Sequence, residues 1–137
     1  MVKFAHRRAR GQRGFTLIEL MIVICIILIL VSIAAPIYSS SIVRAKEAVL
    51  KDDLFTMRSV IDQYTLDKQK APQSLQDLVS AGYLRSIPKD PITGSADTWQ
   101  TTSDDTIMDP NQSQPGITDV HSGASGVSTE GTAYSSW

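Results

Sequence analysis

Glu19 is the only charged residue between Phe15 and Ile37, inside a stretch whose other residues are almost all apolar. A carboxylate at membrane depth costs about 2.5–3.5 kcal/mol on insertion scales, so such a residue usually has a partner. The nearest basic side chain is that of Arg13, on the far side of Gly14. A cut after Gly14 would give Phe15 a new α-amino group four residues before Glu19. That cation and the carboxylate could then pair between neighbouring copies of the chain.

The segment that carries Glu19 is long enough to cross a membrane. Residues 15–37 would form a helix of about 34 Å, and the hydrocarbon core of a bilayer is about 30 Å thick. Five of the 13 basic residues lie within the first 14 positions, so the positive-inside rule places the N-terminus in the cytoplasm. A cleaved secretory signal peptide and a plain single-span anchor are the alternatives. The signal peptide fits poorly, because its apolar stretch has about 7–15 residues and here Pro36 directly follows the small residues Ala34 and Ala35.

Residues 13–20, Arg-Gly-Phe-Thr-Leu-Ile-Glu-Leu, resemble the class III signal of the type IV pilin and pseudopilin superfamily. The resemblance implies that a membrane prepilin peptidase cuts after Gly14 and methylates the new N-terminal Phe15. It also implies that Glu19 acts in assembly and that the apolar helix, after anchoring the precursor, forms the core of a filament. We therefore expect a cleaved leader at 1–14, a transmembrane and filament-core helix at 15–38, and a periplasmic domain at 39–137.

The pattern turns amphipathic after Ser39. Apolar side chains recur at three- and four-residue steps, and neither Gly nor Pro interrupts the chain before Pro72. The sequence therefore predicts one long helix from Phe15 to Lys68, bent near Pro36 where a backbone donor is missing. The apolar stripe, which we expect to pack against the C-terminal domain, consists of Val43, Leu50, Leu54, Met57, Ile61 and Tyr64.

The rest of the chain predicts a short second helix and a small β-ribbon. Ser74 is suited to the N-cap of that helix and Gly82 to its stop. Residues 96–101 and 117–121 are the two strand candidates. The predicted fold class is thus α+β, the type IV pilin fold: a long N-terminal helix, a short helix and an antiparallel ribbon. The side chains expected to hold the ribbon and tail on the long helix are Trp99, Ile117, Val120, Tyr134 and Trp137.

Residues 82–91, Gly-Tyr-Leu-Arg-Ser-Ile-Pro-Lys-Asp-Pro, resemble a segment of the major pseudopilin of type II secretion systems. This branch implies a structural subunit that polymerises with itself and with minor pseudopilins into a periplasmic filament driving protein export. Its other implied partners are prepilin peptidase, membrane lipid, and an inner-membrane assembly platform with its ATPase. The implied location is the bacterial inner membrane, with the C-terminal domain in the periplasm. The alternatives are a type IV pilin of a surface fibre for adhesion, motility or DNA uptake, and a membrane-anchored binding module that never polymerises.

The tail, residues 92–137, needs a fastener beyond its few apolar residues, and the single cysteine, Cys25, allows no disulfide. Major pseudopilins resemble this chain in lacking C-terminal cysteines, and the resemblance implies a calcium ion bound in the loop after the last strands. Calcium takes about 6–8 oxygen ligands. The residues that could supply them here are Asp119, Ser122, Ser125 and Glu130. The alternative is a solvated turn rich in Gly and Ser.

The composition argues against other classes. From residue 90 to residue 137 there are seven acids and no Lys or Arg, so this tail has no basic surface for nucleic acid, and we expect no nucleic-acid partner. Asp119, His121 and Ser122 are too close in sequence to converge as a catalytic triad does, and no Gly motif of the oxyanion type accompanies them. We therefore expect no enzyme.

Overall fold

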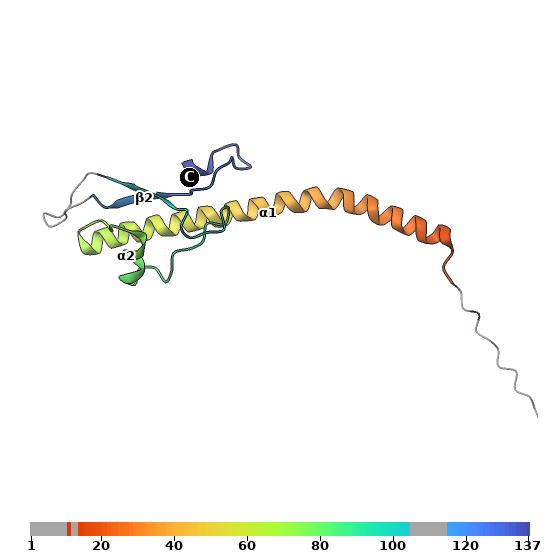
Figure 1. Ribbon diagram of the computed structural model, residues 1–137, viewed down its shortest axis with the longest axis horizontal. Coiled ribbons are helices and arrows are strands. Elements are labelled where there is room, and N and C mark those ends of the chain that lie inside the picture. The colour runs from red at the N-terminus through yellow and green to blue at the C-terminus, as the bar shows by residue number, and fades with distance from the viewer. Residues whose placement is uncertain (1–10, 12–13, 105–114) are drawn as a thin grey trace, which may run out of the picture. The chain divides into compact units, whose positions relative to one another are not determined.

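The computed structural model describes residue 11, residues 14–104 and residues 115–137. Its elements in chain order are α1 (Leu17–Lys68), α2 (Leu75–Ser80), β1 (Gln100–Ser103), β2 (Ile117–His121) and the 3-10 helix η1 (Tyr134–Ser136) (Figure 1). A long helix, a short helix and a two-stranded antiparallel sheet confirm the predicted α+β fold. Most of the predicted leader lies outside the described residues. The chain forms two compact units, Met1–Ser39 and Ser40–Trp137.

In the first unit, α1 begins at Leu17, two residues later than predicted, because Thr16 acts as its N-cap. The Oγ1 of Thr16 accepts a hydrogen bond from the amide of Glu19 at 3.2 Å. That bond satisfies one of the amides that have no partner at the start of a helix. The helix then continues through Pro36, and the bend expected there stays a prediction.

The apolar part of α1 is exposed along its length. An 18-residue window of this helix has a mean hydropathy of 3.2, and none of that window is buried. Among the described residues, α1 is the one helix long and apolar enough to cross a membrane. A helix in the core of a protein would be covered by other elements. Burial in a core therefore does not explain why this part of α1 is apolar.

In the second unit, the core forms along the predicted stripe of α1. Val43, however, is 39% exposed, so its assignment to the stripe was wrong. All side chains from 41 to 46 are exposed, and the cover that the C-terminal domain provides begins at Glu47, which is 5% exposed. The buried apolar side chains of α1 are Leu50, Leu54, Met57, Ile61 and Tyr64.

The predicted second helix is confirmed as α2, with Ser74 at its N-cap. The carboxylate of Asp77 accepts hydrogen bonds from the amides of Gln73 and Ser74 at 2.9 and 3.0 Å, which fixes the first turn. Gly82 follows the C-cap with φ +82°, the left-handed conformation that ends many helices. Leu78 is fully buried in the core cluster with the stripe of α1.

Strands β1 and β2 pair antiparallel, with Gln100 opposite His121 and Ser103 opposite Ile117. The second strand matches its prediction, whereas the first begins at Gln100 instead of 96. Residues 93–98 form a turn, in which the hydroxyls of Thr93 and Thr98 are hydrogen-bonded at 2.6 Å, so they cannot extend as a strand. The expected packing of the ribbon and tail is confirmed, because the core includes Trp99, Ile117, Val120 and Tyr134, with Trp137 packed against it. In Figure 1, α2 and the ribbon flank α1 on opposite sides.

Candidate functional site

Gly14 and Phe15 lie in non-helical backbone just before α1. Phe15 is 83% exposed, and no atom lies within 4 Å of the position that a Cβ would take on Gly14. Exposed backbone outside a helix is the kind of segment that proteases cleave. The local structure is therefore suited to the predicted cut between the two residues, which stays a prediction.

Glu19 occupies the third position of α1, where its negative charge interacts favourably with the helix dipole. Its amide is bonded to Thr16, so the pair has the Thr-x-x-Glu spacing of a capping box, a local signal in the sequence. Within the part of the chain that the structure describes, the carboxylate of Glu19 has no ion pair. It is exposed among apolar side chains and free to meet a cation from another molecule.

The large apolar side chains around Glu19 are mostly half exposed or more. Every residue from 14 to 39 is exposed, and soluble monomers rarely expose apolar patches of that kind. Lipid or other protein must therefore cover it. The exposed residues include Leu17, Ile18, Leu20, Met21, Ile22, Val23 and Ile24 on one stretch and Ile26 to Val31 on the next.

The predicted calcium ligand Asp119 is occupied by protein groups. Its Oδ1 accepts hydrogen bonds from the Nε of Arg58 and from the amide of Val120, each at 2.7 Å. Its Oδ2 lies 3.3 Å from the Nε2 of His121. Burial acts to raise the pKa of Asp119, but the bonds from Val120 and Arg58 outweigh it and hold that pKa below its ordinary value. Asp119 is therefore a charged partner of Arg58.

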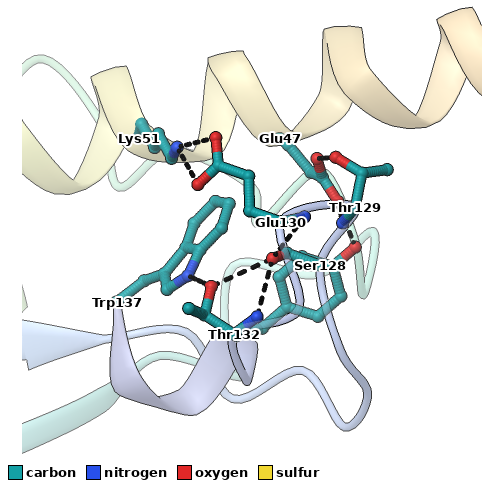
Figure 2. A network of polar contacts seen from close by, with 8 residues as sticks. Glu47, Lys51, Ser128, Thr129, Glu130, Thr132 and Trp137 are labelled. Carbon is teal, nitrogen blue, oxygen red and sulfur yellow. Dashed lines mark hydrogen bonds and ion pairs between the residues drawn. The ribbon is translucent and has the colours of Figure 1, made fainter.

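The second predicted carboxylate, Glu130, is also engaged. Both of its carboxylate oxygens accept hydrogen bonds from the Nζ of Lys51, at 3.0 and 3.1 Å (Figure 2). The same ammonium lies 4.5 Å from the centroid of the Trp137 ring, a cation–π contact. Both members of the ion pair are at least half exposed, so it contributes little to stability by itself.

The two predicted serine ligands do not join these carboxylates. Ser122 is fully buried, and its hydroxyl donates to the Oδ2 of Asp90 and accepts from the amide of Ala124. Ser125 is exposed. The described residues contain no group of three or more His, Cys, Asp or Glu side chains placed to hold a metal ion. As they are placed, the four residues do not fit a calcium site, which needs about 6–8 converging oxygens.

Two buried carboxylates, Glu47 and Asp90, were not predicted from the sequence. Glu47 lies on the buried face of α1, three residues before Leu50. Its spacing continues the apolar stripe toward the N-terminus, and this spacing was the signal that could have identified it as buried. Asp90 is fully buried and accepts hydrogen bonds from the amides of Ile92 and Thr93. The Asp90-Pro91 pair is a common turn signal, and this signal in the sequence could have identified Asp90.

The N-terminal features have a counterpart among known families. Residues 9–35 match the family model described as the prokaryotic N-terminal methylation motif. Together with the exposed apolar helix, this motif defines a prepilin-type, membrane-anchored precursor.

The similarity extends beyond the motif to type II secretion system core protein G of several bacteria. The chain is 36% identical over 96 residues to that protein of Klebsiella pneumoniae, covering 58% of this chain and 69% of the relative. It is 33% identical over 101 residues to that of Escherichia coli strain K12, covering 62% and 70%. For Pseudomonas aeruginosa the identity is 36% over 98 residues, covering 60% and 69%. No solved structure is significantly similar to the chain.

The chain belongs to the family of type II secretion system core protein G, the major pseudopilin. The members of this family are structural pseudopilins and are not known as enzymes. The resemblance to pseudopilins found in the sequence is thereby confirmed.

Proposed function

We propose that a prepilin peptidase removes residues 1–14 and methylates Phe15, and that the mature chain then polymerises into a periplasmic filament of a type II secretion system. Growth of that filament would push folded proteins toward an outer-membrane channel. The motif match over residues 9–35 and the family support the processing step. The exposed segment around Gly14 supports it from the structure.

Polymerisation is supported by the carboxylate of Glu19, which has no ion pair among the described residues and lies on an exposed apolar helix. A charge in a low-dielectric environment is costly unless an opposite charge lies against it. Cleavage before Phe15 creates such a charge, an α-amino group two residues before the same helix begins. Two groups so close in the sequence are suited to pair with those of an adjacent copy, so that each added subunit neutralises one Glu19.

We further propose the orientation and the partners. The five basic residues before the apolar segment favour a cytoplasmic N-terminus. The apolar helix then lies in the inner membrane, and residues 39–137 lie in the periplasm. Lipid covers the apolar helix before assembly, and neighbouring subunits cover it afterwards. The family supports minor pseudopilins, prepilin peptidase, and the assembly platform with its ATPase as further partners.

The test compares two substitutions at the ends of one hydrogen bond. Glu19→Gln keeps the shape of the side chain but removes its charge, whereas Thr16→Ala removes the N-cap and keeps the charge. Each variant is produced as the sole major pseudopilin in cells that overproduce the secretion system. We expect Glu19→Gln to be inserted and cleaved but to form few filaments in electron micrographs, and Thr16→Ala to form them. Normal filaments from Glu19→Gln would contradict the proposed pairing.

A further inference from the structure

The C-terminal loop, residues 126–134, is closed by its own hydrogen bonds. The Oγ of Ser128 accepts from the amides of Glu130 and Thr132, both at 3.2 Å, and its amide donates to the carbonyl of Thr132 at 2.7 Å. An isolated antiparallel bridge joins Val127 to Ala133. The loop therefore has a defined shape, but these bonds do not attach it to the rest of the domain.

Glu47 of α1 makes that attachment. The amide of Thr129 donates to its Oε1 at 2.8 Å, and the hydroxyl of Thr129 donates to its Oε2 (Figure 2). The hydroxyl of Tyr134 donates to Oε1 at 2.8 Å. One buried carboxylate thus receives three hydrogen bonds from the loop. Bonds to a charged acceptor are about twice as strong as bonds between neutral groups, so this is a strong attachment.

Lys51, one turn further along α1, contacts the same loop and the C-terminal residue that follows it. It pairs with Glu130 and lies against the ring of Trp137. The Nε1 of Trp137 in turn donates to the Oγ1 of Thr132 at 2.7 Å (Figure 2). We call the contacts of Glu47 and Lys51 with residues 129–137 the α1 clamp.

We propose that the α1 clamp, centred on Glu47, fastens the C-terminal loop of this chain in place of the calcium ion that its resemblance to major pseudopilins implies. A calcium site of the predicted kind would draw Asp119 of β2 and Glu130 of the loop toward one another around the ion. Here Asp119 instead forms an ion pair with Arg58, and Glu130 forms one with Lys51. Both cations belong to α1. At Glu47 the anion comes from the helix and the donors come from the loop, whereas at Lys51 the helix supplies the cation. This inference is independent of the proposed function, because it concerns the fold of one subunit.

The carboxylate of Glu47 is well suited to remain charged in this position. The hydroxyl of Thr129, its amide and the hydroxyl of Tyr134 all favour the ionised form, and together with Lys51 they outweigh the opposing effect of burial. The pKa of Glu47, which lies outside the predicted membrane segment, is consequently held below its ordinary value of 4.5. No metal is required to stabilise its charge.

The test uses the full chain in detergent micelles and follows thermal unfolding by near-ultraviolet circular dichroism, which reports on the aromatic side chains of the domain. We expect the wild type to melt at the same temperature in millimolar calcium chloride and in excess chelator. Glu47→Gln should lower that temperature by several degrees, because it leaves donors of Thr129 and Tyr134 without a charged acceptor. Asp62→Asn, which removes an exposed carboxylate of the same helix, should leave it unchanged.

Tyr134→Phe is the milder variant, should Glu47→Gln fail to fold. It removes one of the three donors to Glu47, and we expect hydrogen exchange at the amide of Thr129 to become several-fold faster than in the wild type. Two results would overturn the proposal. One is a wild-type melting temperature that rises by several degrees with calcium and loses that rise in Asp119→Asn and Glu130→Gln. The other is unchanged exchange at Thr129 in Tyr134→Phe.

Discussion

Glu47 and Thr129, 82 residues apart in the sequence, are joined by two hydrogen bonds, one from the amide and one from the hydroxyl of the threonine. Both oxygens of a single carboxylate are used, so the loop is fixed in orientation as well as position. Because the buried face of α1 begins at Glu47, these two bonds mark the N-terminal end of that face.

The first prediction concerns pH. Since the pKa of Glu47 is lower in the folded chain than in the unfolded chain, its contribution to stability is fully present above about pH 4.5 and is lost as the pH falls through the folded value. Glu47→Gln should therefore be less stable at neutral pH and should lose less stability between neutral and acidic pH than the wild type does. Denaturant unfolding of both proteins across that range measures the difference. Parallel stability profiles would show that Glu47 does not titrate with folding.

The second prediction concerns the buried pair of Ser122 and Asp90. The hydroxyl of Ser122 donates to a carboxylate that is fully buried, and removing a donor from such a group costs about 1–3 kcal/mol. Ser122→Ala should lower the free energy of unfolding by about that amount. Ser125→Ala is the matched control, because Ser125 is exposed and its replacement should change stability by less than about 0.5 kcal/mol. Equal effects of the two substitutions would refute the structural role of Ser122.

The third prediction concerns Gly123. A Cβ at this position would lie 1.8 Å from the carbonyl oxygen of Thr98, so backbone would have to move to admit any side chain. Overpacking of this kind costs about 1–3 kcal/mol, and we expect Gly123→Ala to lower the melting temperature by several degrees. The measurement is the same thermal unfolding in micelles. A wild-type melting temperature would mean that the close approach of residues 98 and 123 is absent in solution.

The helices could be predicted because their signals are local. The three- and four-residue steps from Leu50 to Tyr64 define a buried face without reference to any partner, and Ser74 and Gly82 mark the ends of α2 by their own chemistry. The first strand was placed too early because the side-chain bonds of the 93–98 turn, such as that between Thr93 and Thr98, compete with an extended chain.

The contacts that fasten the tail could not be predicted in the same way. The partners of Glu47 lie 82 and 87 residues away, and the partner of Asp119 on α1 lies 61 residues away, so no local pattern connects them. The resemblance to major pseudopilins implied carboxylates gathered around an ion. The cations of α1, Lys51 and Arg58, occur at ordinary helix-surface positions and gave no sign of their role.

We propose above that the mature chain, beginning at Phe15, is the subunit of a filament. The most direct measurement is intact-mass and peptide mass spectrometry of filaments sheared from cells that overproduce the secretion system, compared with the same protein from cells lacking prepilin peptidase. We predict that filament subunits begin at Phe15 with a methylated amino group, and that without the peptidase the chain keeps Met1 to Gly14 and enters no filament. Filaments built of subunits that retain the leader, or cleaved chains found only as membrane-bound monomers, would contradict the proposed processing and assembly.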